Sequence, residues 1–141
     1  MIRAAALACA VLVASVCAAA AQSYSKAAKY LIAQEVAAGC ASGGRFASAG
    51  AIERDLNGDG RKDLLLSHDR LQCKGSSKIS RRCGMQVCTV KIYLRQGQLL
   101  KQKMDFLGGG VTAGPTDVPV ISGYAHGGDP WAIRWNGRGF R

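Results

Sequence analysis

One change in the spacing of apolar residues divides this chain and limits the folds open to it. Residues 23–40, SYSKAAKYLIAQEVAAGC, place apolar side chains three and four residues apart, as an amphipathic helix does. The later apolar segments alternate with a period of two, as β-strands do. The sequence therefore predicts an α+β fold, in which one N-terminal helix packs on an antiparallel sheet of about five to seven strands.

Several local signals set the bounds of these elements. Ser23 or Ser25 can cap the start of the helix, and Gly39 can end it in a left-handed turn. Asn136-Gly137 predicts a type I′ hairpin near the end of the chain. The expected strand segments are residues 45–56, 63–71, 85–94, 99–107, 118–124 and 131–135. Three further segments, residues 72–84, 107–117 and 124–130, are expected to be irregular.

The first residues have the pattern of a secretory signal peptide. Arg3 precedes a run of small and apolar residues that ends in Ala19-Ala20-Ala21. We expect cleavage after Ala21, which leaves residues 22–141 as a single α+β domain of 141 − 21 = 120 residues. The mature protein is then expected to be periplasmic or secreted, and no later segment is apolar enough to span a bilayer. A membrane anchor is the alternative interpretation of residues 1–21.

Removal of the signal peptide would reduce the six cysteines to four. The remaining ones are Cys40, Cys73, Cys83 and Cys88. An even number of cysteines in an exported chain favours disulfides, and four can pair in three ways. We favour Cys73–Cys83, which would close a basic loop, together with Cys40–Cys88, which would tie the end of the helix to a strand.

The segment DLNGDGRKD, residues 55–63, has the spacing of a calcium loop. Oxygen-bearing side chains fall at positions 1, 3, 5 and 9, a glycine falls at position 6, and a carbonyl can serve at position 7; these are Asp55, Asn57, Asp59, Asp63, Gly60 and Arg61. Leu66 stands at position 12, where an EF-hand needs a bidentate glutamate, so this is not a helix–loop–helix EF-hand. The alternative is a plain turn, because Asn-Gly and Asp-Gly both favour turns.

The segment DLNGDGRKDLLL resembles the D-x-N-G-D-G-x-x-D calcium loop of FG-GAP and related bacterial secreted β-repeats, in which the loop joins two strands. The resemblance implies that Asp55, Asn57, Asp59, Asp63 and the Arg61 carbonyl bind Ca²⁺. Those proteins repeat the motif around a propeller, whereas this chain has one copy, so neither propeller nor adhesion role is expected. The whole layout also resembles small exported proteobacterial proteins. The cations beside the loop favour a structural site with a Kd of about 10⁻⁴ to 10⁻³ M.

A strongly basic balance points to an anionic partner. The formal net charge is +10, and loss of Arg3 leaves 18 cations against 9 acids. Four cations crowd one segment between two cysteines: Lys74, Lys78, Arg81 and Arg82. Candidate partners are lipopolysaccharide, an acidic envelope polymer or an acidic protein; nucleic acid is disfavoured because no nucleic-acid motif accompanies the charge. The alternative is a solvated basic surface without a partner.

Few residues offer catalytic chemistry. His68 alternates with leucines and is expected in the core or at a sheet edge. His126 has Asp129 three residues on, which could orient its imidazole. We therefore expect a non-catalytic exported binding protein. The alternatives are a small secreted hydrolase that uses His126 and Asp129, and an inhibitor of a secreted enzyme that inserts the cysteine-bounded loop.

Overall fold

The computed structural model describes residues 22–141, and the predicted signal peptide, residues 1–21, lies outside the described residues. The elements, in chain order, are α1 (Lys26–Gly39), β1 (Gly44–Phe46), η1 (Ser48–Gly50), β2 (Ala51–Arg54), β3 (Asp63–Ser67), η2 (His68–Arg70), β4 (Leu71–Cys73), β5 (Cys88–Gln96), β6 (Leu99–Ala113), β7 (Ile121–Tyr124) and β8 (Pro130–Ile133). Within residues 22–141, no helix is both long and apolar enough to cross a membrane.

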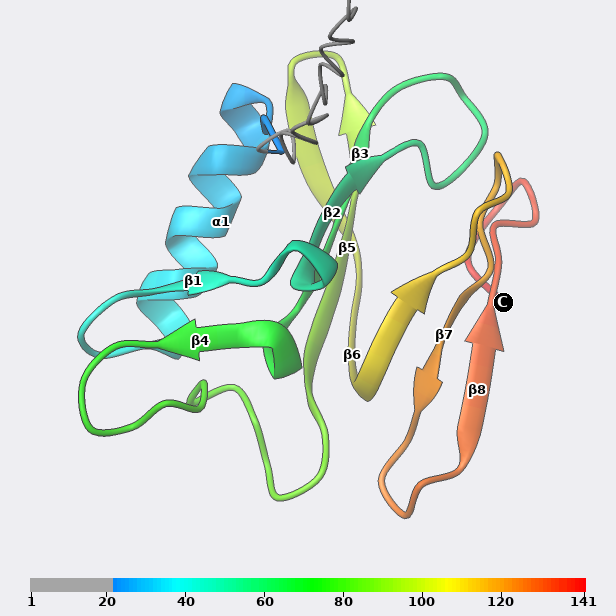
Figure 1. Cartoon of the computed structure of the whole chain (residues 1–141). Helices are drawn as coiled ribbons and strands as arrows, with labels where there is room; N and C mark the ends of the chain where they lie inside the picture. The colour runs from blue at the N-terminus through cyan, green and yellow to red at the C-terminus, as the bar shows by residue number, and fades with distance from the viewer. Residues whose placement is uncertain (1–21) are drawn as a thin grey trace, which may run out of the picture.

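The strands form one large and one small antiparallel sheet. Six strands are ordered β2-β3-β5-β6-β7-β8, and β1 pairs with β4 in a separate two-stranded sheet. Helix α1 lies on one side of the large sheet, and β1 and β4 lie near its C-terminal end (Figure 1). The predicted α+β class, with one helix packed on an antiparallel sheet, is confirmed.

Helix α1 starts as the sequence predicts and ends differently. The Ser25 side chain accepts a hydrogen bond from the Ala28 amide, which caps the first turn. At the other end Cys40 is extended, and Gly39 does not have the positive φ of a left-handed turn. Gly39 serves instead to provide space, because a Cβ there would lie 2.6 Å from the Leu71 side chain and from Ser80 Oγ. The predicted glycine turn is therefore wrong.

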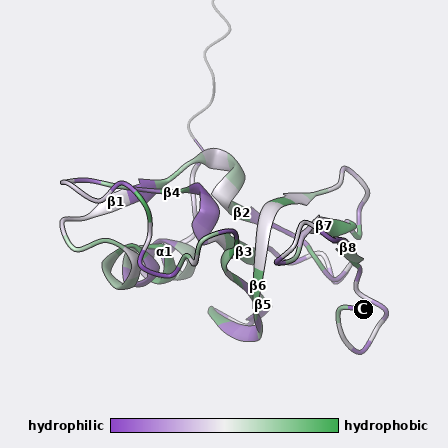
Figure 2. Ribbon diagram, turned by 90° about the horizontal axis from the view of Figure 1, so that it is seen from below, coloured by the Kyte–Doolittle hydropathy of each residue, from purple (hydrophilic) through white to green (hydrophobic). Residues whose placement is uncertain are grey.

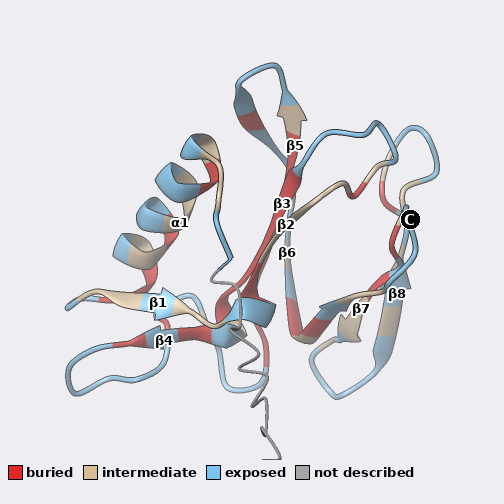
Figure 3. Ribbon diagram, turned by 45° about the horizontal axis from the view of Figure 1, so that its top comes forward, coloured by how far each residue is buried: buried red, intermediate tan, exposed pale blue. Residues whose placement is uncertain are grey.

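Alternation along the strands divides the apolar residues between two cores. On the α1 side, Leu64, Leu66 and Tyr93 are buried against the helix. Leu65 and Ile92, whose positions alternate with these, belong to the second core on the opposite face. Figure 3 shows β3 buried along its whole length and β5 buried at most of its positions, with α1 on one side and the β7–β8 hairpin on the other.

The second core is covered because β6 bends sharply. Its register against β7 shifts between Gly109 and Thr112, and Gly110 has a φ of +59°. A Cβ on Gly109 would lie 2.4 Å from the Tyr124 ring, so glycine is needed where the strands approach. Residues 107–113 are therefore strand rather than the irregular segment expected from sequence. Viewed from below, α1 and the β7–β8 hairpin lie on opposite sides of β3, β5 and β6 (Figure 2).

The disulfides connect Cys40 to Cys73 and Cys83 to Cys88, so the pairing favoured from sequence is wrong. The register of β1 with β4 places Gly44 opposite Cys73, which brings Cys73 beside the end of α1. Cys83 and Cys88 face each other in an isolated bridge at the start of β5. Two disulfides are typical of proteins in oxidising, extracytoplasmic environments.

Three further local predictions need correction. Residues 45–56 do not form one strand, because η1 separates β1 from β2, which belong to different sheets. Residues 63–71 do not form one strand either, because η2 separates β3 from β4. The C-terminal reversal is present, with Trp135 bridged to Phe140, but it is not a type I′ turn. Gly137 has a positive φ while Asn136 does not, and Asn136 Oδ1 accepts hydrogen bonds from the next turn amides instead.

Candidate functional site

The acidic loop, residues 55–63, joins β2 to β3 and brings three carboxylates together. Asp55, Asp59 and Asp63 each offer an oxygen atom, and these atoms all lie within 4.8 Å of one another. The strands on both sides match the expectation that this loop is not an EF-hand. Leu66, at position 12, is fully buried in the core under α1. This carboxylate group could hold a metal ion.

Side-chain oxygens at the first positions fold the loop backbone. The Asp55 carboxylate accepts hydrogen bonds from the amides of Asn57, Gly58 and Gly60 at 3.0, 2.7 and 2.7 Å. Asn57 Oδ1 accepts from the Asp59 amide at 3.2 Å. Gly60 has a φ of +80°, which permits the sharp reversal predicted at position 6. The backbone therefore curls around its own carboxylates.

The carboxylates of Asp59 and Asp63 have opposite electrostatic environments. Burial raises the pKa of Asp63, and the charges of Asp59 and Asp55 raise it further, although the amides of Arg95 and Leu56 donate to it at 2.7 and 2.9 Å. Burial opposes ionisation of Asp59 as well, but hydrogen bonds from Arg61 outweigh it and lower the pKa. A bound cation would neutralise the repulsion that Asp63 experiences.

Arg95 connects the loop to the start of α1. Its amide donates to Asp63, and its guanidinium contacts Ser25 Oγ at 2.9 Å and Glu53 at 3.0 Å. Ser25 in turn donates from its amide and its hydroxyl to Glu53. The same serine that caps the helix is thus held by the strand that enters the loop. This arrangement ties the helix position to the shape of the acidic loop.

The basic loop, residues 74–82, begins directly after Cys73 and ends before Cys83. All four predicted cations in it are exposed: Lys74, Lys78, Arg81 and Arg82. Among residues 22–141, none of the four lies within salt-bridge distance of a carboxylate. Most carboxylates of the described chain are already committed elsewhere, so this loop presents concentrated positive charge.

Several contacts hold the basic loop in place. The Arg81 amide donates to the Gly39 carbonyl at the end of α1, and the Cys73 amide donates to the Lys78 carbonyl. Disulfides flank the loop on both sides. The Ser80 side chain points inward and is only 2% exposed. The cations therefore project from an anchored segment.

Sequence reasoning missed the buried network beneath this loop. Ser80 Oγ lies 2.8 Å from His68 Nδ1, and His68 Nε2 lies 3.0 Å from the Glu35 carboxylate. Lys91 Nζ and the Tyr93 hydroxyl also donate to Glu35, at 2.8 and 3.2 Å. The hydrogen bond from His68 is the largest cause that lowers the pKa of Glu35 to about 2, despite burial. A glutamate on the apolar face of the predicted helix was the one available signal.

The network joins α1, η2, β5 and the basic loop through one carboxylate. Ser80 also accepts a hydrogen bond from the Arg82 amide at 3.1 Å. Ser80, His68 and Glu35 form a chain of hydrogen bonds, as a catalytic triad does. Here, however, Ser80 and His68 are both buried, at 2% and 1% exposure. The arrangement therefore positions the loop and gives substrate no access.

The hydrolase alternative depends on two residues of one turn. His126 and Asp129 are both exposed in the turn between β7 and β8. The turn is held by backbone contacts, including an Ala125 amide that donates to the Asp129 carbonyl. No hydrogen bond joins the two side chains within residues 22–141.

Comparison with family models, curated proteins and solved structures finds no match to this chain.

Proposed function

We propose that this protein is an exported, non-catalytic binding domain, periplasmic or secreted, that attaches to an anionic envelope polymer or an acidic protein through the basic loop. One observation carries the proposal. Four exposed cations project from a segment that two disulfides and a buried network hold in place, and no carboxylate of residues 22–141 neutralises them.

Anchoring matters because a mobile charged loop loses conformational entropy when it binds, whereas an ordered loop has already lost it. Concentrated charge of one sign also attracts an oppositely charged polymer over about a Debye length, roughly 8–10 Å at physiological salt. The basic loop satisfies both conditions. The two disulfides and the pattern of residues 1–21 support export.

Retention on a column of immobilised dextran sulfate tests this proposal. A variant with Lys74, Lys78, Arg81 and Arg82 changed to Gln should elute at markedly lower salt than wild type. The matched control changes four exposed cations elsewhere, Lys26, Lys62, Lys101 and Arg138, to Gln. Equal elution of the two variants would mean that net charge, rather than the basic loop, causes retention, and would contradict the proposal.

We further propose that the acidic loop binds Ca²⁺ in a weak, structural site. Hard oxygen donors at positions 1, 3, 5 and 9 suit this cation, and the Arg61 carbonyl is the candidate fifth ligand. The convergence of Asp55, Asp59 and Asp63 supports this donor set, as does the resemblance to FG-GAP loops. When bound, the ion would supply positive charge to fix the β2–β3 connection. It would perform no catalytic chemistry there.

Calorimetric titration with CaCl₂ tests the metal proposal, with Asp59→Ala as the control variant. We expect heat of binding from wild type only, with a Kd of about 10⁻⁴ to 10⁻³ M. Identical heats from the two proteins would contradict the proposal. Titration with MgCl₂ should give weaker binding, because Mg²⁺ demands a tighter octahedral geometry.

A second candidate function uses the same basic loop as an inserted element that inhibits a secreted enzyme. Ile79 lies within the loop and is 68% exposed, as a side chain that enters a partner's pocket would be. Inhibition of a secreted hydrolase that is abolished by Ile79→Asp, with dextran sulfate retention intact, would favour this function. Inhibition that is unchanged by Ile79→Asp would contradict it.

A further inference from the structure

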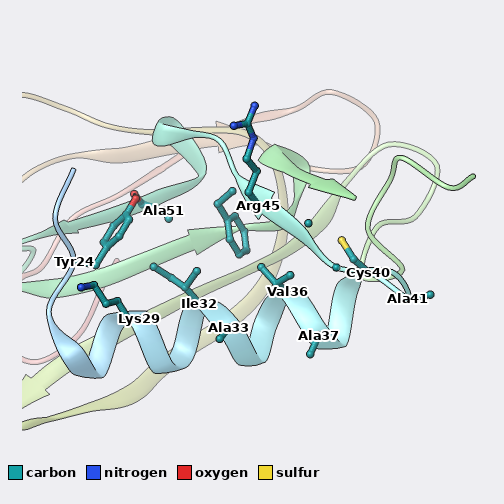
Figure 4. Close-up of a pocket in the computed structure, with 13 residues that line it drawn as sticks. Tyr24, Lys29, Ile32, Ala33, Val36, Ala37, Cys40, Ala41, Arg45 and Ala51 are labelled. Atoms are coloured by element: carbon teal, nitrogen blue, oxygen red, sulfur yellow. The ribbon is translucent and has the colours of Figure 1, made fainter. Parts of the chain in front are cut away.

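A groove of about 630 Å³ runs between α1 and β1, on the side of the helix away from the β5–β6 hairpin. Its helix wall is apolar and includes Ile32, Ala33 and Val36, and its strand wall is Gly44–Phe46 (Figure 4). Tyr24 stands at one end of the groove, and Cys40 and Ala41 stand at the other. This volume falls within the range of known ligand sites, roughly 300–1,000 Å³.

Within residues 22–141, the strand wall has an unpaired backbone edge. β1 has β4 as its sheet neighbour, and the Gly43 carbonyl and the Ala47 amide take part in bonds toward β4. In an antiparallel pair, bonded positions alternate with positions whose amide and carbonyl point outward. Because residues 43 and 47 point toward β4, Gly44 and Phe46 point away from it. An open strand edge of this kind can accept another strand.

The charged residues that line the groove are both cations. Figure 4 shows the Lys29 side chain directed toward the Tyr24 end of the groove, and the Arg45 side chain rising from β1 away from the helix. Both are exposed, and neither pairs with a carboxylate of residues 22–141. A bound segment should therefore carry negative charge at matching positions.

Strand geometry determines which positions of a bound segment should be acidic and which should be apolar. A residue placed opposite Arg45 in an added strand would share the solvent face with the Arg45 side chain, since successive side chains alternate. Its two neighbours would share the opposite face with Phe46, whose ring packs toward α1. Those neighbours would meet the apolar helix wall. The pattern that fits is apolar–acidic–apolar.

We propose that this groove binds an extended segment of a partner protein, with an apolar–acidic–apolar sequence, that adds as a strand to the free edge of β1. The inference rests on the proposed role as a binding domain and specifies one kind of protein partner that the domain binds. Strand addition gives affinity through backbone hydrogen bonds and specificity through alternate side chains. A lipid acyl chain could fill the apolar wall but would leave the Gly44 and Phe46 backbone groups unpaired.

The probe is the fluorescein-labelled peptide Gly-Ser-Val-Glu-Val-Ser-amide, measured by fluorescence anisotropy against protein expressed from the full chain. A peptide with Lys in place of Glu, and one with both valines N-methylated, should each bind at least about tenfold more weakly. Arg45→Glu should reverse the preference, so that it binds the Lys peptide better than the Glu peptide. Arg138→Glu is the matched charge control and should bind as wild type does.

Amide hydrogen exchange supplies the readout specific to strand addition. The peptide should slow exchange at the Gly44 and Phe46 amides, which face outward in the free protein. Binding without protection of these two amides would overturn the inference, and so would occupation of the groove by oleate but by no peptide. If the peptide does not bind but dextran sulfate still retains the protein, only this inference is overturned. If the peptide binds but dextran sulfate does not retain the protein, only the proposed function of the basic loop is overturned.

Discussion

The substitution Glu35→Gln should destabilise the protein, because it removes the charged carboxylate at the centre of the buried network. The pKa of Glu35 falls from 4.5 to about 2 on folding, chiefly because of the hydrogen bond from His68, with Lys91 and Tyr93 also facing the carboxylate. A difference of about 2.5 in pKa corresponds to about 3 kcal/mol of stability near pH 7. Breaking one partner of a buried ion pair costs a similar amount, roughly 3–5 kcal/mol.

The sign of the pH dependence follows from the lowered pKa. Stability from Glu35 is fully present above its unfolded pKa and is lost as the pH falls toward the folded value. The difference in the free energy of unfolding between wild type and Glu35→Gln should therefore fall from about 3 kcal/mol near pH 7 to about 1.5 kcal/mol near pH 3. Contributions from carboxylates remote from Glu35 cancel in the difference.

Urea unfolding, followed by tryptophan fluorescence across this pH range, measures this difference directly. The m-value should be equal for both proteins, because the surface exposed on unfolding is unchanged. A difference below about 0.5 kcal/mol near pH 7 would mean that Glu35 contributes no more than a surface ion pair does, and would contradict the prediction. A difference that does not change with pH would also refute it, because an uncharged contact would then carry the effect.

The disulfides and the end of the helix give two more predictions, both checked by urea unfolding. Because the chain-entropy cost grows with the loop that a bridge closes, loss of Cys40–Cys73, which spans 33 residues, should cost about 4 kcal/mol, and loss of Cys83–Cys88, which spans 5, about 2 kcal/mol. The reverse order would contradict this argument. Gly39→Ala should destabilise by about 1–3 kcal/mol despite better helix propensity, because its Cβ would lie 2.6 Å from Leu71 and Ser80 atoms. A stabilised variant would show that this space is free.

The parts of the fold predicted correctly from sequence depend on local patterns. Ser25 caps α1 because its hydroxyl can reach an amide three residues on, which is a property of one helical turn. The alternation of apolar residues predicted strands, because side chains alternate along any strand. Leu65 and Ile92 on one face, with Leu64 and Tyr93 on the other, follow this alternation. The strands on both sides of the acidic loop were predictable for the same reason.

The parts that were mispredicted or missed depend on contacts between distant segments. The disulfide pairing follows from the β1–β4 register, which spacing along the chain does not determine. The bend of β6 at Gly109 and Gly110 could not be predicted, because these glycines make room for the Tyr124 ring, which belongs to a different strand. Glu35 meets His68 only after η2 is placed against α1. The glutamate on the apolar face of the helix is therefore a local signal that does not identify its partners.

Titration of isotope-labelled protein with a dextran sulfate oligosaccharide, followed by amide chemical shifts, shows which residues contact an anionic polymer. We expect the largest shifts in residues 74–82, and we expect them to diminish as salt is raised. Shifts that spread evenly over the exposed cations of the chain, or that are absent from residues 74–82, would contradict the proposed function of the basic loop.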